Sequence, residues 1–261
     1  MTVNAKQYDI IVVGAGHAGC EAALAAARMG CNVVLLAIDL DKLAAMPCSP
    51  SIGGMPKGQL VKEIAALGGE MAKATDKTAI QYRTLNTKKG PAVHSSRTQN
   101  DKARYHMAMK AVIEAQPGLE LKQAKVQRLV AEGHRVVGIE DNTGFGYQAP
   151  MVILATGTFL SGLIHIGFNS IKAGRAGEFA SYGLAANLKD LGFKLGRLKT
   201  GTPPRLRKSS IDFSKFAMQD GDPEPTPFSG FTEKLTMPQL PSYIGHTNLQ
   251  SHDIVRNNLK Y

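Results

Sequence analysis

The pattern of apolar and polar positions is clearest at the start of the chain. Four apolar residues at positions 10–13 run directly into a glycine-rich turn, and an alanine-rich stretch then continues to residue 30. The apolar run has the length of a buried strand, and the alanine-rich stretch favours a helix. A second apolar run at residues 32–37 completes a strand, helix and strand, which predicts a parallel α/β sheet.

Further helices are predicted where apolar residues recur at helical spacing. This spacing covers residues 60–74, with a break at Gly68 and Gly69, and residues 105–115, ending before Pro117. A third helix is expected at residues 179–191. Residues 39–62 are too rich in Pro, Gly and Ser for regular structure, and a loop of this length inside a compact domain is usually functional.

Residues 119–148 alternate between apolar and polar side chains, which predicts three short strands of an antiparallel meander. The apolar residues 151–154 follow, and we expect them to form a buried parallel strand that returns to the first sheet. Prolines recur over residues 212–241 and favour extended, irregular chain. We therefore expect a Rossmann-like α/β domain over residues 1–200 and the start of a second, inserted domain over 201–261. Because the last residues carry no turn chemistry, we expect the chain to stop inside a longer protein.

The glycine-rich turn matches the dinucleotide-binding pattern G-x-G-x-x-G, with Gly14, Gly16 and Gly19 at the three glycine positions. The first glycine permits a tight turn, the second lets the backbone approach a pyrophosphate, and the third lets helix and strand pack closely. The helix N-terminus then supplies free N–H groups for the phosphates. Ala37 stands where an acidic residue usually holds the ribose, so either Asp39 or a backbone group must take that role.

The net charge of +10 and the pI near 9.5 favour an acidic partner, either nucleic acid or an anionic surface. Basic residues are dense over residues 80–104, where interleaved aromatic residues could stack on bases or on a flavin. The alternative is a solvated helix start followed by a basic loop. Residues 197–207 predict a rigid basic turn. Gly53, Gly54, Lys57 and Gly58 form either a second anion cradle or a plain surface loop.

The three cysteines, Cys20, Cys31 and Cys48, have no C-x-x-C spacing, so we expect neither a disulfide framework nor a metal site. We interpret Cys20 and Cys31 as packed side chains. Cys48 lies between prolines in the irregular loop, where it is either a nucleophile or another packed residue. We expect a cytoplasmic protein, because no apolar run approaches the roughly 18 residues that span a bilayer and no signal peptide is recognisable.

Several longer segments together resemble the MnmG (GidA) family of flavoproteins that modify uridine in tRNA. They are GAGHAGCEAALAAARMG, MPCSPSIGGMPKGQLVKEIAALGGEMAKA, LNTKKGPAVHSSRTQ, ATGTFLSGLIHIG, AGRAGEFAS and RLKTGTPPR. The first segment is shared by many flavoproteins, whereas MPCSPSIGG and KTGTPPR are much more specific. The resemblance covers essentially the whole chain, although family members are roughly twice as long or more.

The resemblance implies an FAD enzyme that works with the GTPase MnmE and modifies C5 of the wobble uridine of certain tRNAs. It implies NADH as reductant, methylenetetrahydrofolate as one-carbon donor, and a homodimer that joins MnmE in a heterotetramer. By motif, FAD would be bound by Gly14, Ala15, Gly16, His17, Ala18, Gly19, Val126 and Ser181. Cys48 falls on the family's first suspected catalytic cysteine. The resemblance also implies that this stretch alone has no turnover.

Two other functions fit the same residues. A small-molecule FAD oxidoreductase would share both nucleotide landmarks, and a basic nucleic-acid-binding module would use the fold only as a scaffold. A flavin spectrum separates the last alternative from the other two, and tRNA binding separates the tRNA-modifying enzyme from the oxidoreductase.

Overall fold

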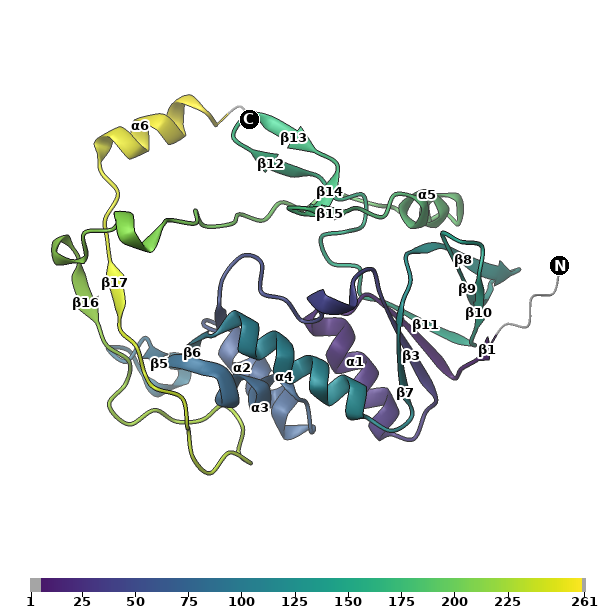
Figure 1. Ribbon diagram of the computed structural model, residues 1–261, viewed down its shortest axis with the longest axis horizontal. Coiled ribbons are helices and arrows are strands. Elements are labelled where there is room, and N and C mark those ends of the chain that lie inside the picture. Colours follow the sequence, from purple (N-terminus) through teal and green to yellow (C-terminus); the bar gives the residue numbers. More distant parts are fainter. Residues whose placement is uncertain (1–5, 260–261) are drawn as a thin grey trace.

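The computed structural model describes residues 6–259 and contains a parallel four-stranded sheet beside a group of helices (Figure 1). The strands of this sheet are β2 (Ile10–Val13), β3 (Val33–Ala37), β7 (Leu119–Gln123) and β11 (Met151–Leu154). They lie in the order β11-β2-β3-β7, and every neighbouring pair is parallel. Counted from β7, the strands are the third, second, first and fourth along the chain, which is the arrangement of a Rossmann-like nucleotide-binding half. The predicted α/β class is confirmed.

The two faces of this sheet bury two separate cores, because successive residues of a strand point to opposite sides. Ile10, Val12 and Leu35 pack with helices α1 (His17–Arg28) and α4 (Lys102–Ala115). Ile11 and Val13 lie on the other face, with the meander and helix α5 (Gly183–Asp190). Both faces are covered, which explains why these strands read as continuous apolar runs in the sequence.

The meander consists of β8 (Val126–Glu132), β9 (Arg135–Asp141) and β10 (Gly146–Gln148), and β1 (Lys6–Gln7) pairs parallel to β10. The expectation of three strands over residues 119–148 was wrong, because the stretch contains four. Its first strand, β7, leaves the meander and pairs with β3 in the parallel sheet. Alternation alone does not identify a strand's neighbour, so the sequence pattern assigned β7 to the wrong sheet.

The strand β11 was correctly predicted to return parallel to the first strand, but it is not buried. Among the strands of the described residues it pairs only with β2, and it forms the edge of the sheet. Met151 is 49% exposed, and Ile153 and Leu154 are also exposed. The apolar run correctly indicated a strand, whereas the burial of its side chains depends on elements that the run itself does not reveal.

Residues 39–104 contain more regular structure than expected. The elements here are η1 (Leu40–Lys42), β4 (Ser51–Gly53), α2 (Lys57–Ala66), α3 (Met71–Thr78), β5 (Ala79–Leu85), η2 (Pro91–Val93) and β6 (Ser95–Asn100). The strands form an antiparallel sheet in the order β4-β6-β5. The alternative of a helix start with a basic loop for residues 80–104 is right for the loop at 86–94 and for the start of α4 at Lys102, but it missed the strands β5 and β6. The strands were missed because they bury polar residues, such as Gln81, Thr98 and Asn100, and so carry no apolar alternation.

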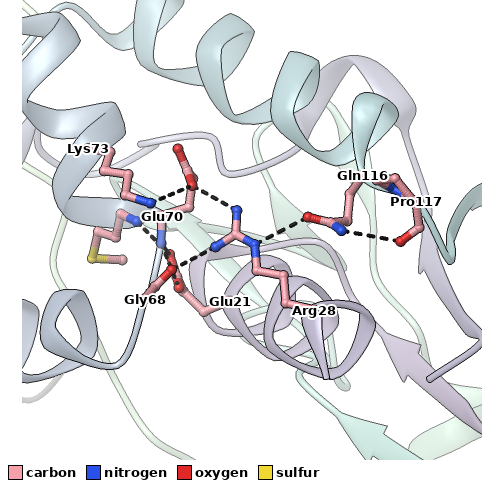
Figure 2. A network of polar contacts seen from close by, with 8 residues as sticks. Glu21, Arg28, Gly68, Glu70, Lys73, Gln116 and Pro117 are labelled. Atoms are coloured by element: carbon pink, nitrogen blue, oxygen red, sulfur yellow. Dashed lines mark hydrogen bonds and ion pairs between the residues drawn. The ribbon is translucent and has the colours of Figure 1, made fainter. Parts of the chain in front are cut away.

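A network of polar contacts joins helices α1, α3 and α4 (Figure 2). The carboxylate of Glu21 accepts hydrogen bonds from the backbone N–H groups of Glu70 (3.1 Å) and Met71 (2.6 Å), at the N-terminus of α3. Arg28 donates to the Gly68 carbonyl at 2.7 Å, to Glu70 at 2.8 Å and to Gln116 at 3.2 Å. The helix that follows the glycine-rich turn is thereby fixed to the helices around it.

The remaining chain is largely extended and runs back over the molecule (Figure 1). It includes β12 (Ile164–Ile166), β13 (Asn169–Ile171), β14 (Ala173–Arg175), β15 (Glu178–Phe179), η3 (Lys208–Ser210), η4 (Phe213–Lys215), β16 (Ala217–Gln219), β17 (Ser242–Ile244) and α6 (Leu249–Asn257). The helix expected at residues 179–191 is α5, which begins four residues later. The buried carboxylate of Asp76 anchors the extended chain by accepting from the N–H groups of Phe228 and Ser229, both at 2.9 Å.

Candidate dinucleotide site and the Cys48 loop

The glycine-rich turn connects β2 to α1 at the carboxyl edge of the parallel sheet. Gly14 has φ of +101°, and a Cβ there would lie 2.4 Å from the Ala155 carbonyl oxygen at the end of β11. A Cβ on Gly19 would lie 1.7 Å from the Gly14 carbonyl oxygen. Glycine is therefore required at both positions, at the first for the left-handed turn and at the second for close packing of helix and strand.

Gly16 differs from the other two glycines, because no atom lies within 4 Å of a Cβ built on it. It is the N-cap of α1 and is exposed. No side chain caps this helix end, and its first turn has no acidic residue. The first N–H groups of a helix have no intrahelical partner, and the dipole there is positive. The open, uncapped terminus has the space and the donors that a dinucleotide pyrophosphate needs.

The residues between the glycines, Ala15, His17 and Ala18, differ in burial and in hydrogen bonding. Ala15 is buried and its carbonyl oxygen accepts from Ala44, whereas Ala18 is exposed. Burial lowers the pKa of His17 and favours the neutral imidazole. Among the described residues, the buried Nδ1 atom of His17 has no hydrogen-bond partner. An orphaned ring nitrogen at this helix end is consistent with a missing ligand group.

Val126 and Ser181, which are 55 residues apart, come together beside this edge. The Ser181 hydroxyl donates to the Val126 carbonyl oxygen at 3.2 Å, and both residues are buried. Val126 lies just beyond the end of β3, because the neighbouring Ala124 donates to the Ala37 carbonyl at 2.8 Å. Val126 shares its buried core with Val13, the residue before the glycine-rich turn. The contact of Val126 and Ser181 with a cofactor stays a prediction.

The ribose position is still without an acidic side chain at the end of β3. Ala37 is buried, and Asp39 accepts a hydrogen bond from the backbone of Asp41 at 2.8 Å, where it caps the short helix η1. Asp39 thus has a structural role through Oδ1.

Cys48 lies in the loop between η1 and β4, against a segment that is about 150 residues away in sequence. Its thiol donates to the Gly201 carbonyl oxygen at 2.9 Å. The Arg205 guanidinium donates to the carbonyl oxygens of Pro47 at 2.6 Å and of Cys48 at 3.0 Å. The two most specific motifs of the sequence, MPCSPSIGG and KTGTPPR, are thus in contact. The sequence carried no signal for this pairing.

The other two cysteines differ from Cys48 in their surroundings. Cys20 is fully buried in α1, and burial raises the pKa of its thiol to about 12, which makes it a poor nucleophile. Cys31 is partly buried against the same core. Within residues 6–259 all three cysteines are free, and no group of three or more His, Cys, Asp or Glu could hold a metal ion.

The proposed second anion cradle is better explained by packing. A Cβ on Gly53 would lie 2.3 Å from the Ser96 carbonyl oxygen, and one on Gly58 would lie 2.6 Å from the Ser95 hydroxyl. The Gly54 and Gly58 N–H groups already donate within the protein, at 2.9 and 2.7 Å. These glycines let the loop lie against β6, which favours the packed-loop alternative. A separate hollow of about 240 Å³ borders Gly58, Lys62, His94 and Thr226.

The fold and the glycine-rich turn define a dinucleotide-binding α/β protein, with the candidate site at the carboxyl ends of β2 and β11. Within the described part of the chain, no helix has the length and apolarity needed to cross a membrane. The family model described as Glucose inhibited division protein A matches residues 9–261. The chain belongs to this family, as the sequence resemblance predicted.

Named relatives agree with this assignment. The chain is 60% identical over 254 residues to the tRNA uridine 5-carboxymethylaminomethyl modification enzyme MnmG of Syntrophobacter fumaroxidans, covering 97% of this chain and 40% of that protein. It matches the structure of Aquifex aeolicus GidA with a TM-score of 0.92 and 46% identity, over 98% of this chain and 44% of that one. A GidA-related protein from Thermus thermophilus matches at a TM-score of 0.54 and 27% identity, over 72% of this chain and 70% of that chain. The chain spans about two fifths of the length of its curated relative.

Proposed function

We propose that this chain is the FAD-binding part of an enzyme that modifies uridine in tRNA. The observation that carries the proposal is the open, uncapped N-terminus of α1 at Gly16, in a chain 60% identical to a protein named as a tRNA uridine 5-carboxymethylaminomethyl modification enzyme. The N–H groups there would hold the pyrophosphate, and Val126 and Ser181 would border the cofactor. Bound FAD would supply redox chemistry, which a protein side chain alone does not provide.

The resemblance supplies the finer part of the proposal. The full protein would use NADH and methylenetetrahydrofolate, act as a homodimer together with the GTPase MnmE, and work in the cytoplasm on the wobble uridine. Residues 201–261 would begin an inserted domain. Cys48 would be the nucleophile toward the uracil ring or a one-carbon adduct, since it is the one cysteine in a loop lined by cationic side chains.

A second function, oxidation or reduction of a small molecule with FAD, would use the same cofactor cradle. The close match to proteins named for tRNA modification and the net charge of +10 favour the tRNA substrate. Loss of the modified wobble nucleoside in cells lacking the full-length protein would support tRNA modification. An unchanged nucleoside profile would favour the small-molecule alternative.

The cofactor site is tested by the flavin absorption of full-length protein that carries Gly16→Val. The added side chain would fill the space for the pyrophosphate, so we expect the variant to fold and to lose bound flavin. Gly196→Val is the matched control. A Cβ at Gly196 also meets no atom within 4 Å, and this residue is far from the glycine-rich turn in sequence. If Gly16→Val retains as much flavin as the control, the cofactor is bound elsewhere.

A further inference from the structure

Three cationic side chains lie around the loop of residues 47–51, two of them from residues 97–102 and one from residue 205. Arg97 on β6 donates to the Ser51 hydroxyl at 3.1 Å. Arg205 donates to the carbonyl oxygens of Pro47 and Cys48, as described above. Lys102 is the first residue of α4, and only the capping residue Asp101 separates it from the end of β6. That strand end is fixed to the loop, because Asn100 donates to the Pro50 carbonyl at 2.8 and 2.9 Å.

Within the described part of the chain, no carboxylate balances the charge of this cluster. Among residues 6–259, no carboxylate lies within 4.0 Å of the cationic nitrogens of Arg97, Lys102 or Arg205. Asp101 is next to Lys102 in sequence, but its carboxylate caps α4 and pairs with Arg104 at 3.6 Å. Burial and the nearby Arg205 lower the pKa of Lys102, and Cys48 is the one group that acts in the opposite direction. Like charges held together without a counter-ion favour the binding of an anion.

The donors of the cluster are only partly used. Arg205 and Arg97 each make their hydrogen bonds to the loop through a single nitrogen, Nη2. The other N–H groups of each guanidinium have no acceptor among residues 6–259 and can donate to a ligand. Both arginines are exposed, and Lys102 is partly exposed. A phosphate accepts several charge-assisted hydrogen bonds at once, and arginine matches its geometry well.

We propose that Arg97, Lys102 and Arg205 form a binding site for a backbone phosphate of the RNA substrate, beside Cys48. This inference rests on the proposed function and adds the part of the substrate that is held here. A phosphate fixed at this position would place the attached nucleotide within reach of the Cys48 loop. The three cations would therefore orient the target nucleotide, whereas its base would be recognised by other residues.

The test uses Lys102→Gln in the full-length protein. Lys102 has no ion-pair partner within residues 6–259, so this change should leave the fold of the loop intact. Binding of a fluorescein-labelled RNA hairpin with an unpaired loop uridine is measured by anisotropy at several salt concentrations. We expect affinity to fall on the order of tenfold, as for the loss of a charged hydrogen bond. The slope of log affinity against log salt should decrease by about 0.7 to 0.9, the value for one phosphate contact.

Two further variants and a competition with inorganic phosphate show whether the effect is specific to the charge of Lys102 and to RNA. Lys189→Gln, an exposed lysine on α5, removes the same charge elsewhere, and Lys102→Arg keeps the charge and should restore binding. Bound hairpin should also protect Cys48 from iodoacetamide, with Cys31 as the internal reference. Equal affinity and slope for Lys102→Gln and Lys189→Gln would overturn the proposal. Protection of Cys48 by millimolar inorganic phosphate, without protection by RNA, would also overturn it, because it would indicate a small-anion site.

The two levels of the hypothesis fail in different ways. If the parent protein binds no RNA, both the tRNA substrate and this phosphate site are wrong. If the parent binds RNA and supports wobble modification while the Lys102 variants behave as the control does, the proposed function stands and the phosphate site is wrong.

Discussion

Glu21 lies on α1, but its carboxylate accepts hydrogen bonds from the N-terminus of α3 (Figure 2). Removing this carboxylate should therefore destabilise the protein by weakening α3. Helix α3 has no side-chain cap and no acidic residue in its first turn, so its terminal N–H groups depend on Glu21 from α1. Loss of a capping acceptor costs about 1 kcal/mol, and loss of a negative charge at a partly buried helix N-terminus costs up to about 2 kcal/mol. We therefore expect Glu21→Ala to lower the free energy of unfolding by about 2 to 3 kcal/mol.

Glu21→Gln separates the two contributions. The amide oxygen can still accept a hydrogen bond, but the charge is lost, so this variant should cost about half as much as Glu21→Ala. Urea unfolding followed by circular dichroism gives both values, provided that the slope with denaturant is unchanged. For a chain of this size, Glu21→Ala should lower the melting temperature by roughly 4 to 12 °C.

The control is Glu63→Ala, which removes an exposed glutamate from α2 that has no ion-pair partner among the described residues. Such surface changes usually fall within about 0.5 kcal/mol. Hydrogen exchange provides a local readout, because the amides of residues 70 and 71 should lose protection in Glu21→Ala before the rest of α3 does. Unchanged exchange at these two amides, or a stability equal to that of the control, would refute the capping role.

Three further predictions address other parts of the molecule. Asp76→Ala removes the acceptor of the Tyr82 hydroxyl and of two backbone N–H groups. It should lower the free energy of unfolding by roughly 3 to 5 kcal/mol and make residues 217–242 accessible to limited proteolysis. An unchanged digest would argue against this anchor. Burial alone would raise the pKa of Glu120, but hydrogen bonds from Lys6, Tyr8 and Lys122 outweigh it and lower the pKa to about 2, below its ordinary value of 4.5. Glu120 therefore contributes stability above pH 4.5 that is lost as the pH falls toward 2, and urea midpoints at about pH 6 and about pH 3.5 should differ less in Glu120→Gln than in the parent. Cys48→Ser in the full-length enzyme should keep bound flavin and lose uridine modification, and near-normal modification would show that the thiol only packs.

The fold near the glycine-rich turn could be predicted because its determinants are local. Residues 10–37 carry the apolar runs, the helix-forming alanines and the three glycines within one short stretch. Gly14 and Gly19 have a conformational or steric reason to be glycine, and Gly16 leaves open space at the helix end. The antiparallel sheet of β4, β5 and β6 was missed because it buries several polar side chains. One of them, Gln81, donates to the Gln219 carbonyl and accepts from the Ser242 hydroxyl, both far away in the chain. The assignment of β7 to the meander failed for a related reason, since strand pairing is not a property of one segment.

The sequence by itself determined the α/β class, the parallel strand β11, the dinucleotide turn and the family. These features follow from short-range periodicity, from the special backbone freedom of glycine and from specific motifs. Only the tertiary structure decided that β11 forms an exposed edge, that Val126 meets Ser181, and that Gly201 and Arg205 close against Cys48. Each of these depends on contacts between residues far apart in the chain, and such contacts are set by the packing of whole elements rather than by the residues that make them.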